Sequence, residues 1–116
     1  MILSFGWTAQ YLPPNGAKDT TRRIWNPKTL GIWHRAWDEG RLEHVAVDKC
    51  YGGKRIGLIT LTARPELEPL YKMPAADLIR EGGMCSTVPG FIDAYFGGNA
   101  DQEVAVVRFK FEELVL

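Results

Sequence analysis

The sequence has no long apolar run, only two cysteines and no excess of charge of either sign. No stretch approaches the roughly 18 to 20 consecutive apolar residues that span a bilayer, and the N-terminal MILSFGW lacks the basic lead and cleavage site of a secretion signal. Cys50 and Cys85 stand without a CxxC or CxxH partner, which argues against a zinc site or a disulfide framework. We therefore expect a cytoplasmic protein with two free thiols, no membrane contact, no metal and no cofactor.

Size and charge restrict the protein class further. Hydrophobic residues make up 46% of the 116 positions and are spread along the chain, which fits one compact domain over residues 1–116. The formal net charge of zero argues against a general nucleic-acid coat. Residues 1–37 nevertheless hold five basic side chains against Asp19 alone, a net charge of +4, so the remainder sums to −4. This asymmetry favours a local anion-binding surface, although basic side chains that only solvate an exposed loop would give the same pattern.

Hydrophobic patterning predicts strands interrupted by short helices. Alternate side chains of an extended segment face one way, which would put Thr21 and Arg23 on one face. The order of the elements contains no repeated βαβ crossover, so it predicts an α+β fold with a mostly antiparallel sheet, or small β-barrel, flanked by short helices. The expected strands cover 1–6, 19–25, 42–50, 54–63 and 102–114, the expected helices 26–40, 73–83 and 87–98, with a helical turn at 7–12 and a turn at 13–16.

The Trp-rich segment from Trp25 to Trp37 has two interpretations. Trp33 and Trp37 recur at helical spacing, which is more typical of a core face than of a ligand platform. Exposed indoles on the same segment would instead mark a surface for a protein partner. His34 and His44 fall outside any catalytic pattern, so we expect structural or surface roles for both.

Four stretches together resemble a known family. They are NGAKDTTRR followed by a tryptophan, the hairpin YGGKRIGLITLT, the segment LIREGG and the terminal VAVVRFKF. In this order they are similar to the ASCH domain, the activating-signal-cointegrator homology module of the PUA-like superfamily. The resemblance covers nearly the whole chain, and its most specific part is the G-x-K-x-x-T-x-R pattern, which runs from Gly16 to Arg23.

The resemblance implies a small β-barrel with a cleft for RNA or nucleotides. Some members cleave RNA, and a group of short bacterial members hydrolyses the acyl amide of N4-acetylcytidine with a lysine, a threonine and a glutamate. Carried over to this sequence, those catalytic residues are Lys18, Thr21 and Glu81. Asp19 stands where many members have threonine, and the Trp-rich segment resembles a longer branch of the family, so the resemblance leaves the substrate open.

Several functions therefore stay open at this point. The first is a module that binds RNA, a nucleotide or a nucleoside, with Arg22 and Arg23 as anion ligands and with Trp25 either stacked on a base or packed in the core. The second is an amidohydrolase in which neutral Lys18 activates the Thr21 hydroxyl and Glu81 assists the departure of the amine. The third is a non-catalytic protein-interaction module. A purely structural alternative is a buried ion pair of Lys18 with Glu81 that holds a helix against the barrel.

Overall fold

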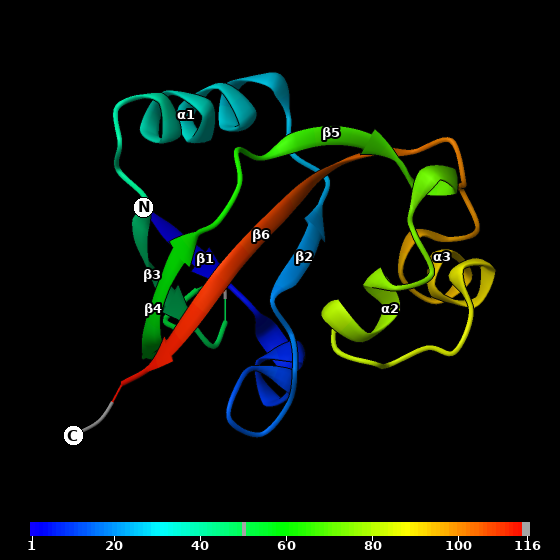
Figure 1. The fold of residues 1–116 in the computed structure, drawn as a ribbon, viewed down its shortest axis with the longest axis horizontal. Helices are drawn as coiled ribbons and strands as arrows, with labels where there is room; N and C mark the ends of the chain where they lie inside the picture. The colour runs from blue at the N-terminus through cyan, green and yellow to red at the C-terminus, as the bar shows by residue number, and fades with distance from the viewer. Residues whose placement is uncertain (50, 115–116) are drawn as a thin grey trace.

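A strongly curled, mostly antiparallel sheet of six strands forms a half-barrel (Figure 1). The computed structural model of the chain describes residues 1–49 and 51–114. The strands follow the order β1-β3-β4-β6-β2, and β5 also pairs with β6. The pair β1 and β3 is parallel, and the other pairs are antiparallel. The strands are β1 (Ile2–Ser4), β2 (Thr20–Arg23), β3 (Glu43–Val47), β4 (Arg55–Leu61), β5 (Glu66–Pro69) and β6 (Glu103–Glu113).

Strand β6 is the centre of the sheet. Its eleven residues pair with β4 through Phe109–Glu113, and with both β2 and β5 through the half that precedes Phe109. A continuous run from Val104 to Val107 is buried, which matches a strand that is covered on both faces. Since β1 and β2 are the two ends of the strand order, they form the open seam of the half-barrel.

The helices are short and lie around the sheet. Figure 1 shows α2 and α3 together on one side, with α1 apart from them. The Asn26 side chain caps α1 by accepting from the Thr29 N–H at 2.8 Å, and Pro27 takes the first turn, as the sequence predicts. The helices are η1 (Gly6–Tyr11), α1 (Pro27–Asp38), η2 (Leu70–Lys72), α2 (Asp77–Arg80) and α3 (Val88–Phe96), where η marks a 3-10 helix.

The α+β half-barrel confirms the predicted fold class, with two local corrections. The helix expected over 73–83 shrinks to the four residues of α2, because Pro74 precedes it and Gly82 and Gly83 follow it with φ values of 134° and 73°. Strand β5 was not predicted, since its sequence ELEP has no β-branched residue. Its extended state comes from pairing with β6.

The Trp-rich segment packs inward. Trp33 is buried in the main core, and Trp25 and Trp37 lie half-buried against that core. The rings of Trp25 and Trp33 stack with centroids 5.1 Å apart, while His44 meets Trp33 edge-on at 4.6 Å. The His34 ring nitrogen Nε2 contacts the Pro65 carbonyl oxygen, so both histidines have the structural contacts that we expected.

Two further findings concern the helices and the cysteines. Over residues 1–49 and 51–114, none of the helices has the length and apolar character that crossing a membrane requires. Cys85 is a free thiol, and Cys50 lies outside the described residues.

Candidate functional site

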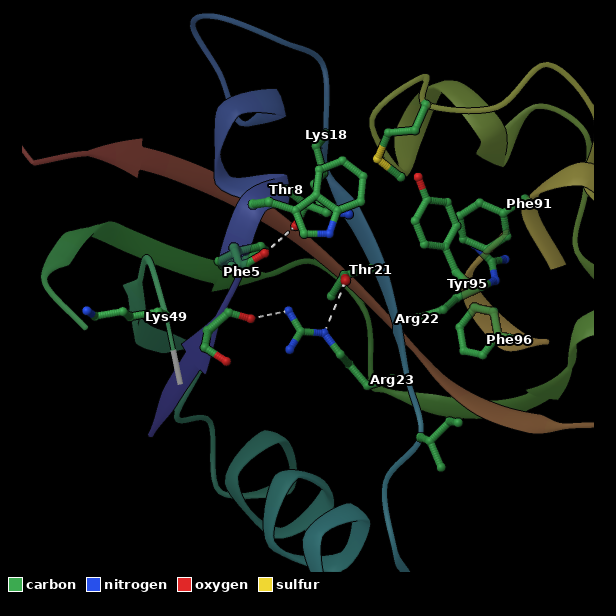
Figure 2. A pocket seen from close by; sticks show the side chains of 15 residues that line it. Phe5, Thr8, Lys18, Thr21, Arg22, Arg23, Lys49, Phe91, Tyr95 and Phe96 are labelled. Carbon is green, nitrogen blue, oxygen red and sulfur yellow. Dashed lines mark hydrogen bonds between the residues drawn. The ribbon is translucent and has the colours of Figure 1, made fainter. Parts of the chain in front are cut away.

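A cleft of about 490 Å³ opens over strand β2. Residues 4–8, from the end of β1 into η1, form one wall, and residues of α3 form the other. Figure 2 shows Thr21 and Arg23 in the middle of the cleft, with Phe91, Tyr95 and Phe96 on the opposite side from Phe5. The cleft thus lies where the half-barrel is left open.

Aromatic rings dominate the walls of the cleft. Trp7 is 55% exposed, and its indole stacks on the Tyr95 ring with centroids 5.7 Å apart and planes 27° apart. The Phe91 ring extends this cluster, with its centroid 5.2 Å from that of Tyr95. Trp7 reaches the cleft because Gly6, at a φ of 56°, turns the chain two residues after the end of β1. The exposed indole gives the cleft a flat apolar surface of the kind that stacks on a planar ligand.

Sequence reasoning missed Trp7 and Tyr95. The first stands in a short helical turn without a motif and the second on an ordinary amphipathic helix, 88 positions apart by the numbering. They meet only because the fold brings η1 against α3. No motif or spacing in the sequence links these two residues.

Lys18 lies in the floor of the cleft and is only 2% exposed. Its Nζ donates to the Thr20 carbonyl at 3.0 Å and to the Glu81 carbonyl at 2.7 Å. Burial lowers the pKa of Lys18 from 10.5 to about 8; the charges of Arg23 and Arg22 add to this fall, and the Glu81 charge opposes it. At a pH slightly above the physiological value, a sizeable fraction of the amine is therefore neutral.

The backbone before Lys18 explains the glycine of the motif. The Lys18 N–H donates to the Tyr11 carbonyl at 3.0 Å, and the Gly16 N–H donates to the Leu12 carbonyl at 3.1 Å. A Cβ on Gly16 would lie 2.2 Å from the Tyr11 oxygen, closer than any side chain allows. Glycine at this position therefore permits the close approach that brings Lys18 into the floor.

Thr21 and Arg23 share the cleft-facing side of β2, which confirms that prediction. The Arg23 Nε donates to the Thr21 Oγ1 at 3.2 Å, a bond drawn in Figure 2. Arg23 also donates from Nη2 to the Ser4 carbonyl, and its guanidinium lies 5.5 Å from the centre of the Phe5 ring. Arg23 thus links β2 to β1 across the open seam.

Glu81 follows α2 and is buried behind the cleft, outside its lining. Its Oε1 accepts from the Arg22 backbone N–H at 3.2 Å, and its Oε2 lies 3.8 Å from Arg22 Nη1. No described residue hydrogen-bonds this Oε2, and burial raises the pKa of the carboxyl. Lys18 donates to the backbone carbonyl of this residue and not to its carboxylate. Since no salt bridge joins the two side chains among the described residues, the alternative of a Lys18–Glu81 ion pair is wrong.

The Arg22 side chain, with 0% exposure, belongs to a buried ion cluster. Its Nη2 lies 2.6 Å from Asp77 Oδ2 and 3.2 Å from Glu68 Oε1, and Arg108 pairs with the same Asp77 oxygen at 2.9 Å. Burial alone would raise the pKa of Asp77, but hydrogen bonds from Arg108 and Arg22 outweigh it and lower that pKa. Arg22 therefore ties β2 to α2 and β5, although part of it also reaches the cleft lining.

The structure brings together most, but not all, of the predicted site residues. Lys18, Thr21, Arg22 and Arg23 line one cleft, whereas Trp25 stacks in the core and is not among the lining residues. Within the part of the chain that the structure describes, no three histidine, cysteine or acidic side chains come together as metal ligands.

Comparison with known proteins gives a fold but no family. No family model matches the sequence, and no curated protein matches it. The chain is similar in structure to protein EF3133 from Enterococcus faecalis V583, whose crystal structure is described with the family model DUF984. The TM-score is 0.56 and the identity 15%, over 97% of this chain and 76% of that one. At this identity the likeness concerns the fold alone.

Proposed function

We propose that the cleft binds RNA, a nucleotide or a nucleoside. The observation that carries this is the exposed Trp7 indole, stacked on Tyr95 beside the polar floor that holds Lys18, Thr21 and Arg23. A planar base stacks on the indole, while hydroxyl and cationic groups bind its polar edge, ribose or phosphate. The resemblance of the motif to ASCH domains, in the PUA-like superfamily, points the same way.

The size of the cleft agrees with a ligand of this kind. About 490 Å³ falls in the range of small-molecule sites, which combine apolar walls with a few placed polar groups. One exposed indole offers one stacking position, so the cleft suits one nucleotide unit better than a long strand.

Binding is tested by calorimetry with short single-stranded RNAs, nucleotides and nucleosides at about 50 mM salt, where phosphate contacts count most. Loss of one stacking ring costs roughly 1 to 3 kcal/mol, so Trp7→Ala should weaken binding by about 5- to 150-fold. Tyr71→Ala is the matched control, because Tyr71 is 58% exposed and lies outside this cleft. Equal affinities of Trp7→Ala and wild type, or no binding by any of these ligands, would sink the proposal.

A second candidate is hydrolysis of an acylated nucleoside such as N4-acetylcytidine. The lowered pKa of Lys18 and the presence of the Thr21 hydroxyl in the same cleft favour it. Neutral Lys18 takes the hydroxyl proton as the Thr21 oxygen attacks the acyl carbon, and the resulting ammonium returns that proton to the departing amine as the C–N bond breaks. Water then cleaves the acyl-threonine ester, which releases the carboxylic acid and restores the Thr21 hydroxyl. The Glu81 carboxylate faces Arg22 and lies outside the cleft lining, so in this scheme Glu81 does not assist the leaving amine as expected. It fixes Lys18 through its backbone carbonyl instead.

Chromatographic detection of cytidine after incubation with N4-acetylcytidine tests this chemistry. Thr21→Ser should keep part of the activity, and Thr21→Val should have none. The rate should rise with pH through about 8, as Lys18 becomes neutral. Absence of cytidine at high protein concentration, or a rate in Thr21→Val equal to wild type, excludes it.

The third alternative, a protein-binding surface made of the indoles in the Trp-rich segment, is not favoured. Trp33 is buried, and Trp25 and Trp37 pack against the core. We therefore leave the Trp-rich segment out of the proposed function.

A further inference from the structure

We propose that the cleft selects a phosphate-bearing nucleotide, free or at the end of an RNA strand, over the uncharged nucleoside, and that the buried Lys18 ammonium supplies the selecting charge. This inference rests on the proposed function of the same cleft. It narrows the ligand to one charge class and assigns the selection to one residue.

The charge of the cleft lining carries the inference. Among the described residues that line the cleft, four are basic, namely Lys18, Arg22, Arg23 and Lys49, and none is acidic. A concave site lined by one sign of charge with low-dielectric walls concentrates ligands of the opposite sign. The aromatic walls beside these cations supply such a low-dielectric surface.

The acidic groups nearby neutralise Arg22 more than Lys18. Arg22 lies within 2.6 Å of Asp77 and 3.2 Å of Glu68. Lys18 instead donates to two backbone carbonyls, those of Thr20 and Glu81. These uncharged acceptors leave the ammonium charge in place and account for two of its three N–H donors. The remaining donor and the charge are what a phosphate oxygen would use.

Phosphate binding should therefore change the protonation of Lys18. Its pKa is lowered to about 8 by burial, with Arg23 and Arg22 lowering it and Glu81 and Asp19 raising it. A bound anion favours the ammonium form and moves this pKa upward again. Below pH 8 the lysine is already protonated and binding is strongest; above pH 8 binding must take up a proton, so affinity falls as the pH rises.

Arg23 and Lys49, which also line the cleft, have different roles. Arg23 is already oriented toward the cleft by Thr21 and Ser4. Lys49 is exposed, and Figure 2 shows it at the far side of the cleft from the aromatic wall of α3. A proton-linked affinity that is centred near pH 8 and is lost in Lys18→Met therefore identifies Lys18 as the selecting charge.

The experiment is calorimetry of the wild-type chain with CMP and cytidine, and with AMP and adenosine, at about 50 mM salt. Cytosine and adenine do not lose a proton between pH 7 and pH 10, so the ligands add no titration of their own. We expect each monophosphate to bind about 10-fold or more tightly than its nucleoside at pH 7, and this advantage to shrink by about 10-fold at pH 10. At pH 8, paired buffers of different ionisation enthalpy should reveal uptake of about half a proton per CMP bound.

Two lysine variants assign the effect. Lys18→Met keeps the length of the side chain and should abolish both the proton uptake and the pH dependence. Lys49→Met should keep both. If Lys18→Met does not fold, the proton uptake of the wild-type chain decides: uptake centred near pH 8, the pKa of Lys18, supports the inference, and its absence overturns it.

The outcomes separate this inference from the proposed function. Equal affinity for CMP and cytidine overturns the inference and leaves the proposed function standing, whereas no binding of nucleosides, nucleotides or RNA overturns both. A preference for CMP without proton uptake, or one lost in Lys49→Met, also overturns it. A dinucleotide with a terminal phosphate, compared with CMP, distinguishes an RNA end from a free nucleotide, and either result supports the phosphate selection.

Discussion

Replacing Lys18 by methionine should change the stability of the protein in a way that depends strongly on pH. Lys18 is 2% exposed to solvent, and its pKa is lowered from 10.5 to about 8. Keeping it protonated in the folded chain therefore lowers the free energy of unfolding. At about 1.4 kcal/mol per pH unit, that change in pKa corresponds to roughly 3 kcal/mol. The cost is fully present below pH 8, where both folded and unfolded chains carry the proton.

The sign of the pH effect follows from proton counting. Between pH 8 and 10.5 the unfolded chain holds the Lys18 proton and the folded chain does not, so the free energy of unfolding rises with pH. Lys18→Met lacks this gain. The difference in stability, wild type minus variant, should therefore increase by about 3 kcal/mol between pH 7.5 and 10.5, and by about 2 kcal/mol if the series stops at pH 10.

Urea unfolding followed by tryptophan fluorescence measures this difference at each pH. The loss of the hydrogen bonds from Nζ to two carbonyls is the same at every pH, so it shifts the curve without changing its slope. Lys110→Met, at an exposed position of β6, is the control and should give a constant difference from wild type. A constant difference for Lys18→Met would show that Lys18 titrates as an ordinary lysine, which refutes both the hydrolytic scheme and the proton-linked selection.

Two further predictions concern the acids behind the cleft. Asp77→Asn removes the charge that pairs with buried Arg22 and should cost about 3 to 5 kcal/mol, against about 1 kcal/mol or less for the exposed Asp38→Asn. Because the pKa of Asp77 is lowered, its contribution to stability should be lost as the pH falls below 4. Urea unfolding measures both variants, and an equal loss of stability in Asp77→Asn and Asp38→Asn would contradict the expected difference. Glu81→Gln removes a carboxylate whose pKa is raised, so the free energy of unfolding at pH 7 should fall little or should rise. The pKa of Lys18 should fall below 8 in this variant, because the Glu81 charge that raises it is gone. A fall in the free energy of unfolding above about 3 kcal/mol would show that the ionised form of Glu81 is required.

The parts of the fold that local chemistry specifies could be predicted from the sequence. Asn26 and Pro27 carry the signals of a helix start, and the helix begins there. The alternation in β2 places Thr21 and Arg23 together, and they are hydrogen-bonded. Strand β5 could not be predicted, because Glu66–Pro69 becomes a strand only through its pairing with β6.

The site divides in the same way. The short spacing of the motif predicted that Lys18, Thr21 and Arg23 lie in one site, since residues this close in the chain share one strand or its entrance. The stacking pair of Trp7 and Tyr95 depends on a contact between distant segments, for which a single sequence holds no signal. No pattern of residue types distinguishes a contact to the Glu81 carbonyl from one to its carboxylate, so the form of its link to Lys18 also required the structure.

The position of the cleft follows from the way the barrel stops short of closing. The two end strands of the sheet, β1 and β2, do not pair with each other in the strand order, and an open seam would leave backbone polar groups exposed. Arg23 satisfies one of them by donating to the Ser4 carbonyl, while η1 and α3 lay Trp7 and Tyr95 over the gap. A closing strand would satisfy these groups with backbone hydrogen bonds and leave no room for a ligand. Because side chains bridge the seam instead, Arg23, Trp7 and Tyr95 connect its two sides. The same three residues also line the cleft with an aromatic surface and a cationic group.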